Sequence, residues 1–442
     1  GKVARGGSRA NNFRADFDEG NVFHLGTKIK ECSDAVGLLA VVLKHGAKLN
    51  FINISAAWGK VAKMKNSRGR QVDGGLVQGA LLTALLPLTE ARVGDMGARE
   101  VVSVLHSMAK LRPGSRSTPL VDALLTHAGS SAEGFTSQGV ANLLWAVATM
   151  GVKLEPGLMG VMQQRAVETG GGANPQDVTN VMWALATLNV KPEPELMGVM
   201  QARGVTLAGE FAPQGVANLV WALAKLEAGS ESKDLVHAMQ RQAAATAEGF
   251  KPRELGMLCW GLARMQAGIQ EDMLRALSAH AVLTAGSFAP ENISMIMWAL
   301  AKSEVAPEAG LVEAMQRRAT ATSIGFSAQE VANLLWALTR SGVEMQGAFL
   351  DAMQTRAVQC AGQFRPQGVA NLLWAFATAG VQPRADLLEA MYQRALATAG
   401  EFNQTDVKHV IGALEKLGAT HLARSPELVS ALARTARRTD PL

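Results

Sequence analysis

The sequence predicts an all-α protein, a right-handed α-solenoid of about nine helical-hairpin repeats of about 38 residues each. Seven tryptophans recur at intervals of 38 or 39 residues: Trp145, Trp183, Trp221, Trp260, Trp298, Trp336 and Trp374. Nearly the same ten residues surround several of them, as in VANLLWALTR from Val331 and VANLLWAFAT from Val369. Alanine, leucine and methionine are abundant, whereas β-branched residues are few and tyrosine occurs once, a balance that favours helix.

Each repeat reads as two helices, which we call A and B. A phenylalanine precedes most of the tryptophans by ten residues, at Phe135, Phe211, Phe250, Phe288, Phe326 and Phe364. A proline often follows it two residues later, where a helix can begin without losing a hydrogen bond. The apolar run around the tryptophan is helix A, and a breaker such as Gly380-Val381 ends it. Helix B follows, for example over residues 385–400.

The repeats divide the chain into four predicted segments. Residues 1–27 lack a helical period and read as a basic, glycine-rich extended arm. Residues 28–96 read as divergent N-terminal helical repeats, and residues 97–402 as the regular repeats. Residues 403–442 read as a capping repeat with a short tail, because terminal repeats of solenoids are usually atypical.

The excess positive charge lies in the first part of the chain. Residues 1–75 hold 13 Lys and Arg against 6 Asp and Glu, whereas the remaining residues hold 30 against 32. A basic contact with a polyanion is therefore expected to be local. Its candidate residues in the arm and in the loop at 66–75 are Lys2, Arg5, Arg9, Arg14, Arg68 and Arg70.

Helix A carries a second set of candidates. Successive residues of a helix are turned by 100° about its axis, so three other positions fall within about 60° of the tryptophan. They are the glutamine seven residues before it, the asparagine three residues before it and the residue four after it. We call these positions the polar stripe, and it faces away from the apolar packing side. Its candidate RNA-binding residues are Gln138, Asn142, Gln176, Asn180, Gln214, Asn218, Lys225, Arg253, Arg264, Lys302, Gln329, Asn333, Arg340, Gln367, Asn371, His409 and Lys416.

The polar stripe suits RNA chemically, although each residue type has a structural alternative. Amides can bond base edges of single-stranded RNA, and Lys and Arg can meet phosphates along one concave surface. Each asparagine can equally bond a neighbouring backbone carbonyl. The tryptophans are better explained as wedges between repeats than as stacking platforms for bases. In helix B, a methionine belongs to the core, and an arginine three residues later can bond a carbonyl, an acid or, less readily, a phosphate.

Several functional classes have no support in the sequence. The three cysteines are far apart and read as buried reduced thiols, without zinc spacing. No apolar run is long enough to cross a membrane. No phosphate-binding loop, nucleophile elbow or metalloprotease motif occurs. We therefore expect no catalytic residue, no metal and no cofactor.

The motifs F-x-P-Q-x-V-A-N-L-L-W-A-L-A-T/K and L-x-x-A-M-x-x-R-A resemble the octotricopeptide repeat family over roughly residues 30–438. This resemblance implies a non-catalytic RNA-binding solenoid of an organelle. It implies partners among ribosomal RNA or organellar messenger RNA, and neighbouring ribosomal or ribonucleoprotein subunits. We expect a mitochondrial protein, with the chloroplast as the alternative, and a ribosome-bound role slightly ahead of a free messenger RNA factor for stabilisation, processing or translation.

Two rival functions remain open at this stage. A protein–protein scaffold of the armadillo or HEAT type would explain the near-neutral charge of residues 76–442. An RNA-processing enzyme is a weaker third reading, since no residue constellation supports it.

Overall fold

The fold is an all-α solenoid, as predicted. The computed structural model describes residues 22–64, 74–111 and 118–430, and no strand occurs among them. The helices are α1 Val22–Glu31, α2 Ala35–His45, α3 Phe51–Met64, α4 Gly74–Glu90, α5 Ala98–Leu111, α6 Thr118–Ser130, α7 Ser137–Met150, α8 Pro156–Thr169, α9 Pro175–Leu188, α10 Pro194–Thr206 and α11 Pro213–Lys225. They continue as α12 Lys233–Ala245, α13 Pro252–Met265, α14 Glu271–Leu283, α15 Pro290–Lys302, α16 Ala309–Ala321, α17 Ala328–Arg340, α18 Gly347–Gln359, α19 Pro366–Ala379, α20 Ala385–Ala397, α21 Gln404–Lys416 and α22 Thr420–Ala423.

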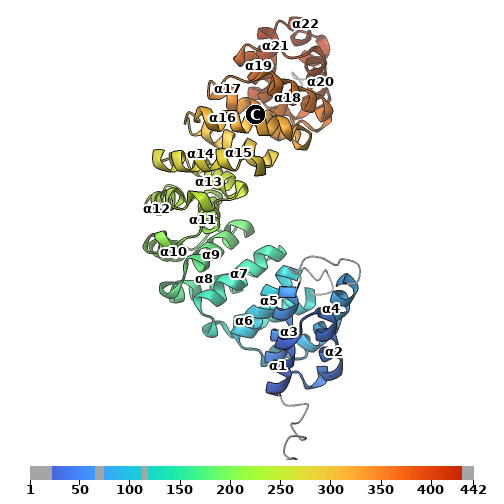
Figure 1. Ribbon diagram of the computed structural model, residues 1–442, viewed down its shortest axis with the longest axis vertical. Coiled ribbons are helices and arrows are strands. Elements are labelled where there is room, and N and C mark those ends of the chain that lie inside the picture. Colours follow the sequence, from blue (N-terminus) through green and yellow to red (C-terminus); the bar gives the residue numbers. More distant parts are fainter. Residues whose placement is uncertain (1–21, 65–73, 112–117, 431–442) are drawn as a thin grey trace, which may run out of the picture. The chain divides into compact units, whose positions relative to one another are not determined.

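The helices form two compact units, Gly1–Arg203 and Gly204–Leu442. Within each unit the odd-numbered helices pack side by side in chain order, α1 to α9 in the first and α11 to α21 in the second (Figure 1). The even-numbered helices form a second row against them, α2 to α8 and α12 to α20. Helices A are thus the odd row and helices B the even row.

The array begins earlier and contains more repeats than expected. Helix α1 starts at Val22, so the extended arm predicted for residues 1–27 is wrong for residues 22–27. Leu25 and Ile29, one helical turn apart, are fully buried and α1 packs on α3, which explains why this segment is helical. Within the described ranges, α1 to α20 pair as ten hairpins and α21 begins an eleventh, compared with the predicted nine or so.

Local sequence signals set the ends of helices A. A short 3-10 turn such as Ala132–Gly134 precedes each regular helix A, followed by a phenylalanine in most repeats, by Ala173 before α9 and by Met96 before α5. The side chain of Thr136 accepts the Gly139 N–H, and Ser327 forms a capping box with Glu330, so orphan N–H groups of the first turn are satisfied. After the helix, glycines such as Gly380, with φ 67°, adopt the left-handed conformation that ends it.

A repeated hydrogen bond joins the end of helix B to the start of helix A in the same repeat. Its acceptor is the carbonyl of the buried residue just before helix A, and we call it the carbonyl clamp. The arginine Nε groups of Arg165, Arg203, Arg318, Arg356 and Arg394 donate to the carbonyls of Phe135, Ala173, Phe288, Phe326 and Phe364 at 2.6–2.8 Å. Gln242 does the same to Phe211 at 2.8 Å, and His127 and His280 to Met96 and Phe250 at 2.7 and 2.9 Å.

The carbonyl clamp answers the question left open for the helix B arginines. Their Nε groups donate to a backbone oxygen that accepts no hydrogen bond within a helix. The prediction that these arginines bond a carbonyl is therefore confirmed. A hydrogen bond from a charged donor contributes about 1.5–3 kcal/mol. The phenylalanines that carry these carbonyls are at most 3 % exposed, so each clamp fastens helix B to the edge of the core.

A second recurring bond joins several of the repeats to the next one along the chain. A buried glutamine of helix B accepts the backbone N–H that precedes the following helix B, and we call this the glutamine bridge. The pairs are Gln163 with Glu193, Gln240 with Gln270, Gln316 with Gln346, and Gln354 with Arg384, at 2.7–2.9 Å. Because the glutamines are at most 5 % exposed, these bonds are sheltered from water.

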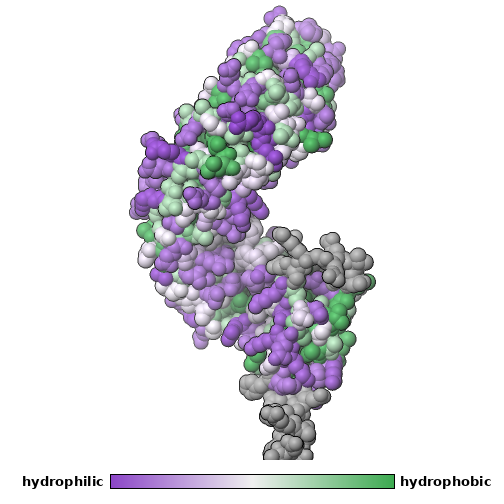
Figure 2. Space-filling view, viewed as in Figure 1, coloured by the Kyte–Doolittle hydropathy of each residue, from purple (hydrophilic) through white to green (hydrophobic). Residues whose placement is uncertain are grey.

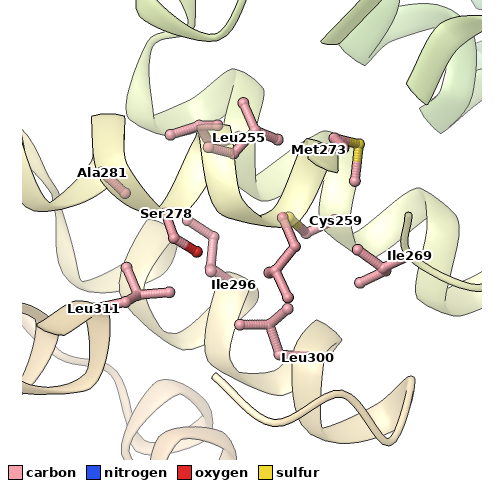
Figure 3. A pocket seen from close by; sticks show the side chains of 11 residues that line it. Leu255, Cys259, Ile269, Met273, Ser278, Ala281, Ile296, Leu300 and Leu311 are labelled. Atoms are coloured by element: carbon pink, nitrogen blue, oxygen red, sulfur yellow. The ribbon is translucent and has the colours of Figure 1, made fainter. Parts of the chain in front are cut away.

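The glutamine bridge fails at α14, where Ser278 stands in the glutamine position. Its hydroxyl is buried without a hydrogen-bond partner and cannot reach the N–H of Glu308, the equivalent of the bridged groups. The side chain points into an apolar cavity lined by α13, α14 and α15, including Cys259 and Ile296 (Figure 3). Burial raises the pKa of the Cys259 thiol to about 12, so it stays protonated. The cavity lies where a longer side chain would fill the junction.

The three cysteines are free thiols, as expected, with Cys259 and Cys360 buried and Cys32 half-buried. None of the described helices is long and apolar enough to cross a membrane.

The outer faces of α2 and α4 are apolar. Val36, Leu43 and Leu76 are 62, 69 and 81 % exposed. Figure 2 shows hydrophobic surface over these two helices. The corresponding face of α16 instead carries the exposed pair Glu313 and Arg317. The apolar face belongs to the even row, whereas the polar stripe belongs to the odd row.

We predict that Ser278→Gln stabilises the second unit by about 1 kcal/mol, because it adds the missing bridge and fills part of the cavity. The matched change Gln316→Ser removes an existing bridge and should cost about 1–3 kcal/mol. Urea unfolding with hydrogen exchange of α14 and α16 measures both. Destabilisation by Ser278→Gln, or a neutral Gln316→Ser, would contradict the assigned role of the glutamine bridge.

Candidate nucleic-acid interface

The amides of the polar stripe lie on the accessible side of helices A. The five glutamines Gln138, Gln176, Gln214, Gln329 and Gln367 are exposed, and the five asparagines Asn142, Asn180, Asn218, Asn333 and Asn371 are half-buried. Within the described ranges, none of these ten side chains makes a hydrogen bond to another residue. The alternative in which each asparagine bonds a neighbouring carbonyl is therefore not what the fold adopts. The amides are left open to a ligand.

Four cations lie at the C-terminal ends of helices A, two of them on helices with the amide pair (α11 and α17) and two on helices without it (α13 and α15). Lys225, Arg264, Lys302 and Arg340 are all exposed. Arg264 lies 3.7 Å from Glu227, and Arg340 lies 3.0 Å from Glu304, in each case an acid of the preceding repeat. The arginine side chains are still 56 and 50 % exposed, so these are weak surface pairs that a phosphate can displace.

The two acids occupy an unusual backbone conformation. Glu227 and Glu304 both have φ 56°, in the left-handed region where other repeats use Gly151, Gly342 or Gly380. A non-glycine residue there costs about 1–2 kcal/mol. The strained turn directs a carboxylate toward the next cation of the stripe, and sequence reasoning missed both acids.

The remaining predicted site residues divide into two groups. Arg253, His409 and Lys416 are exposed on α13 and α21. His409 lies near the buried Asp406, whose pKa is raised mainly by burial and partly lowered by His409. The basic candidates Lys2, Arg5, Arg9, Arg14, Arg68 and Arg70 lie outside the described residues.

The seven repeat tryptophans are half-buried. Trp298 packs on Cys259, Ala263 and Ala299, two of which belong to the preceding helix A. Such packing fits the predicted wedge, yet each indole remains partly exposed. The rings of Trp336 and Trp374 come within 6.4 Å of each other at an angle of 38°.

His106 takes the tryptophan position in α5. Its ring lies 4.8 Å from that of Trp145, and its Nδ1 is buried without a hydrogen-bond partner. Burial, together with the positive charge of Lys110, lowers the pKa of His106 to about 4. The imidazole is therefore neutral at pH 7 and serves as an aromatic packing group.

The fold brings four of the predicted amides together in one groove. Gln329 and Asn333 of α17 face Gln367 and Asn371 of α19 across it. Arg365 and Gly368 also line this groove, and neither was among the predicted residues. Only the packing of one helix A on the next brings them there, which the sequence of a single repeat does not reveal.

The described part of the chain offers no cluster of metal-binding side chains. What the geometry provides is accessible amide pairs on α7, α9, α11, α17 and α19, together with exposed cations and partly exposed indoles on helices A. This combination is that of a helical-repeat protein with polar side chains accessible on one row of its helices.

The chain belongs to the family described as RNA-editing substrate-binding complex 6 protein, whose sequence profile matches residues 80–346 and 269–437. No curated protein sequence matches it.

Three solved structures align with most of this chain at low identity. A homology model of the full-length AP-3 complex in an intermediate open conformation is 10 % identical, with 95 % of this chain and 81 % of that chain covered and a TM-score of 0.32. A crystal structure of an engineered protein is 12 % identical, with 86 and 97 % covered and a TM-score of 0.20. The pentatricopeptide repeat protein PPR10 from maize is 10 % identical, with 90 and 82 % covered and a TM-score of 0.15. At these TM-scores the likenesses carry no argument about function.

We predict that the protein loses stability as the pH falls from about 6.5 to about 4, in part through His106. In that window the unfolded chain takes up a proton at this residue while the folded chain does not, so stability rises with pH and levels off above 6.5. His106→Gln should flatten this dependence. Urea midpoints measured across the window test it, and identical pH profiles for the two proteins would refute the assignment.

Proposed function

We propose that this chain is a non-catalytic RNA-binding solenoid that holds single-stranded or irregular RNA along its row of helices A. The observation that carries this proposal is the set of ten stripe amides, none of which makes a side-chain hydrogen bond within the part of the chain that the structure describes. Carboxamides offer a donor and an acceptor side by side, which matches the edges of unpaired bases. The exposed cations at the helix ends are placed to meet phosphates.

RNA is a better ligand for this surface than a protein scaffold partner. A protein interface normally centres on apolar and aromatic anchors, whereas the exposed part of the stripe is dominated by amides and cations. The name of the family refers to substrate binding in RNA editing, which supports an RNA ligand. The near-neutral balance of residues 76–442 limits the phosphate contribution and leaves more of the affinity to base contacts.

We further propose that the protein works as a subunit of an organellar ribonucleoprotein, in the mitochondrion rather than the chloroplast. The family name speaks of a complex and supports neighbouring protein subunits. It also favours an RNA-processing assembly over the ribosome as the setting, with ribosomal RNA as the second candidate ligand and free messenger RNA regulation as the third. We assign the repeats to the octotricopeptide type because they carry the motif F-x-P-Q-x-V-A-N-L-L-W. Lys2, Arg5, Arg9, Arg14, Arg68 and Arg70 add phosphate contacts in this proposal.

We predict that changing Lys225, Arg264, Lys302 and Arg340 together to alanine weakens binding of single-stranded RNA. Each lost phosphate contact removes about 0.7 from the slope of log affinity against log salt, so the slope should flatten by up to about 3. Filter binding across a salt series measures this effect, and circular dichroism checks that the fold is intact.

The opposite change serves as a matched control on the same surface. Glu227→Gln with Glu304→Gln removes the counter-ions of Arg264 and Arg340, and RNA affinity should rise by about two- to tenfold at low salt. If neither set of changes alters RNA affinity, the protein scaffold becomes the better explanation.

A further inference from the structure

We infer that the groove between α17 and α19 is a base-reading slot that takes one unpaired adenine. This inference rests on the proposed RNA-binding function and adds to it the place and the base that are read. The groove is lined by Gln329 and Asn333 on one side and by Gln367 and Asn371 on the other, with Arg365 at its edge.

The four amides distinguish this junction from the others of the second unit. The neighbouring helices α13 and α15 carry Arg253 with Met257, and Glu291 with Met295, at the same two positions. Helix α21 carries His409 in the asparagine position. Among the described helices of Gly204–Leu442, α17 and α19 are therefore the adjacent pair with a complete amide set on both sides.

Small residues keep the groove open. Ala332 lies on one wall and is 1 % exposed, and Gly368 lies on the other. A Cβ atom on Gly368 would stand 3.3 Å from the ring of Phe364 and 3.9 Å from the Cβ of Ala332, so a side chain there would occupy the floor of the groove. The equivalent residue of α17, Glu330, is turned back to cap its own helix.

The amides select a base rather than an anion. A phosphate or carboxylate uses donors only and would leave the four amide oxygens unmatched. An unpaired adenine presents a donor beside an acceptor at two edges, N6–H with N7 and N6–H with N1, so one carboxamide from each wall can bind it with two hydrogen bonds. Uracil has a single N3–H donor and can satisfy only one carboxamide in this way. The half-buried position of Asn333 and Asn371 strengthens these bonds relative to bonds made in open water.

Arg365 supplies the phosphate contact that goes with the base. It is exposed, lies at the N-cap of α19 and makes no side-chain bond to cap the helix. No described acid forms an ion pair with it, in contrast to Arg340 on the preceding helix. Because a phosphate contact positions RNA without reading sequence, Arg365 should contribute affinity but no preference.

The test compares fluorescence anisotropy of labelled oligoadenylate and oligouridylate on the full chain. We expect the wild type to bind oligoadenylate about tenfold more tightly, since a bidentate base contact discriminates by roughly that factor or more. Asn333→Met with Asn371→Met places in α17 and α19 the residue that the chain itself uses in α13 and α15. Helices α7 and α9 carry the same four amide types, but α9 has the buried Asp177 at the position of Gly368, so the variant should lose the preference and keep its affinity for oligouridylate.

Two glycine variants distinguish a specific loss of the slot from a general loss of structure. Gly368→Val should also abolish the preference by filling the groove, whereas Gly139→Val, the same change at the equivalent position of α7, should leave it intact. Gly139 suits this role because α5, which packs on α7, lacks the amide pair. Arg365→Ala should weaken binding of both oligonucleotides equally.

The outcomes separate the slot from the proposed function. RNA binding with a preference unchanged in the methionine and valine variants overturns the slot and leaves the RNA-binding function standing. An equal loss in Gly368→Val and Gly139→Val also overturns the slot. Absence of RNA binding by the wild-type chain overturns both.

Discussion

The carbonyl clamp is the interaction on which the rest of the structure depends. A solenoid repeat is too small to bury a core alone, so its two helices must be held at a fixed angle before neighbours can stack on them. In this chain a side chain near the end of helix B reaches back about 30 residues to the carbonyl before helix A, from Arg165 to Arg394. The clamp closes each hairpin and satisfies a backbone group that no helix uses.

The functional surface follows from this arrangement. With the hairpins closed, the apolar side of each helix A faces its neighbours, and the side that bears glutamine, asparagine and cation is left accessible. The indoles lie between these two environments, partly packed at the junctions and partly exposed. The same repeat that stabilises the array therefore presents its stripe positions in the same way on each helix A, with amides on some helices and other side chains on α13, α15 and α21.

The sequence predicts the repeat well because the tryptophan spacing fixes the register of every regular helix A. The stripe positions follow from that register and from helix geometry alone, which is why Gln329 and Asn333 are accessible as expected. Whether these positions contact RNA remains a prediction. Helix α1 was missed because Leu25 and Ile29 provide only two apolar turns beside a glycine-rich segment. Glu227 and Glu304 were missed because they lie in loops, in the left-handed conformation, and a projection along a helix includes only helical residues. The α17–α19 groove and the void at Ser278 depend on contacts between repeats, which no single repeat encodes.

The carbonyl clamp also bears on how such an array changes its length. Its acceptor is a backbone oxygen, which every amino acid supplies, and its donor is an arginine, a glutamine or a histidine in different repeats. A segment running from one pre-helix phenylalanine to the next carries both partners of its own clamp. Duplication or deletion of that segment in the gene adds or removes one whole hairpin, and no clamp donor or acceptor is left without its partner. The reach of the binding surface can thus evolve in steps of a single hairpin.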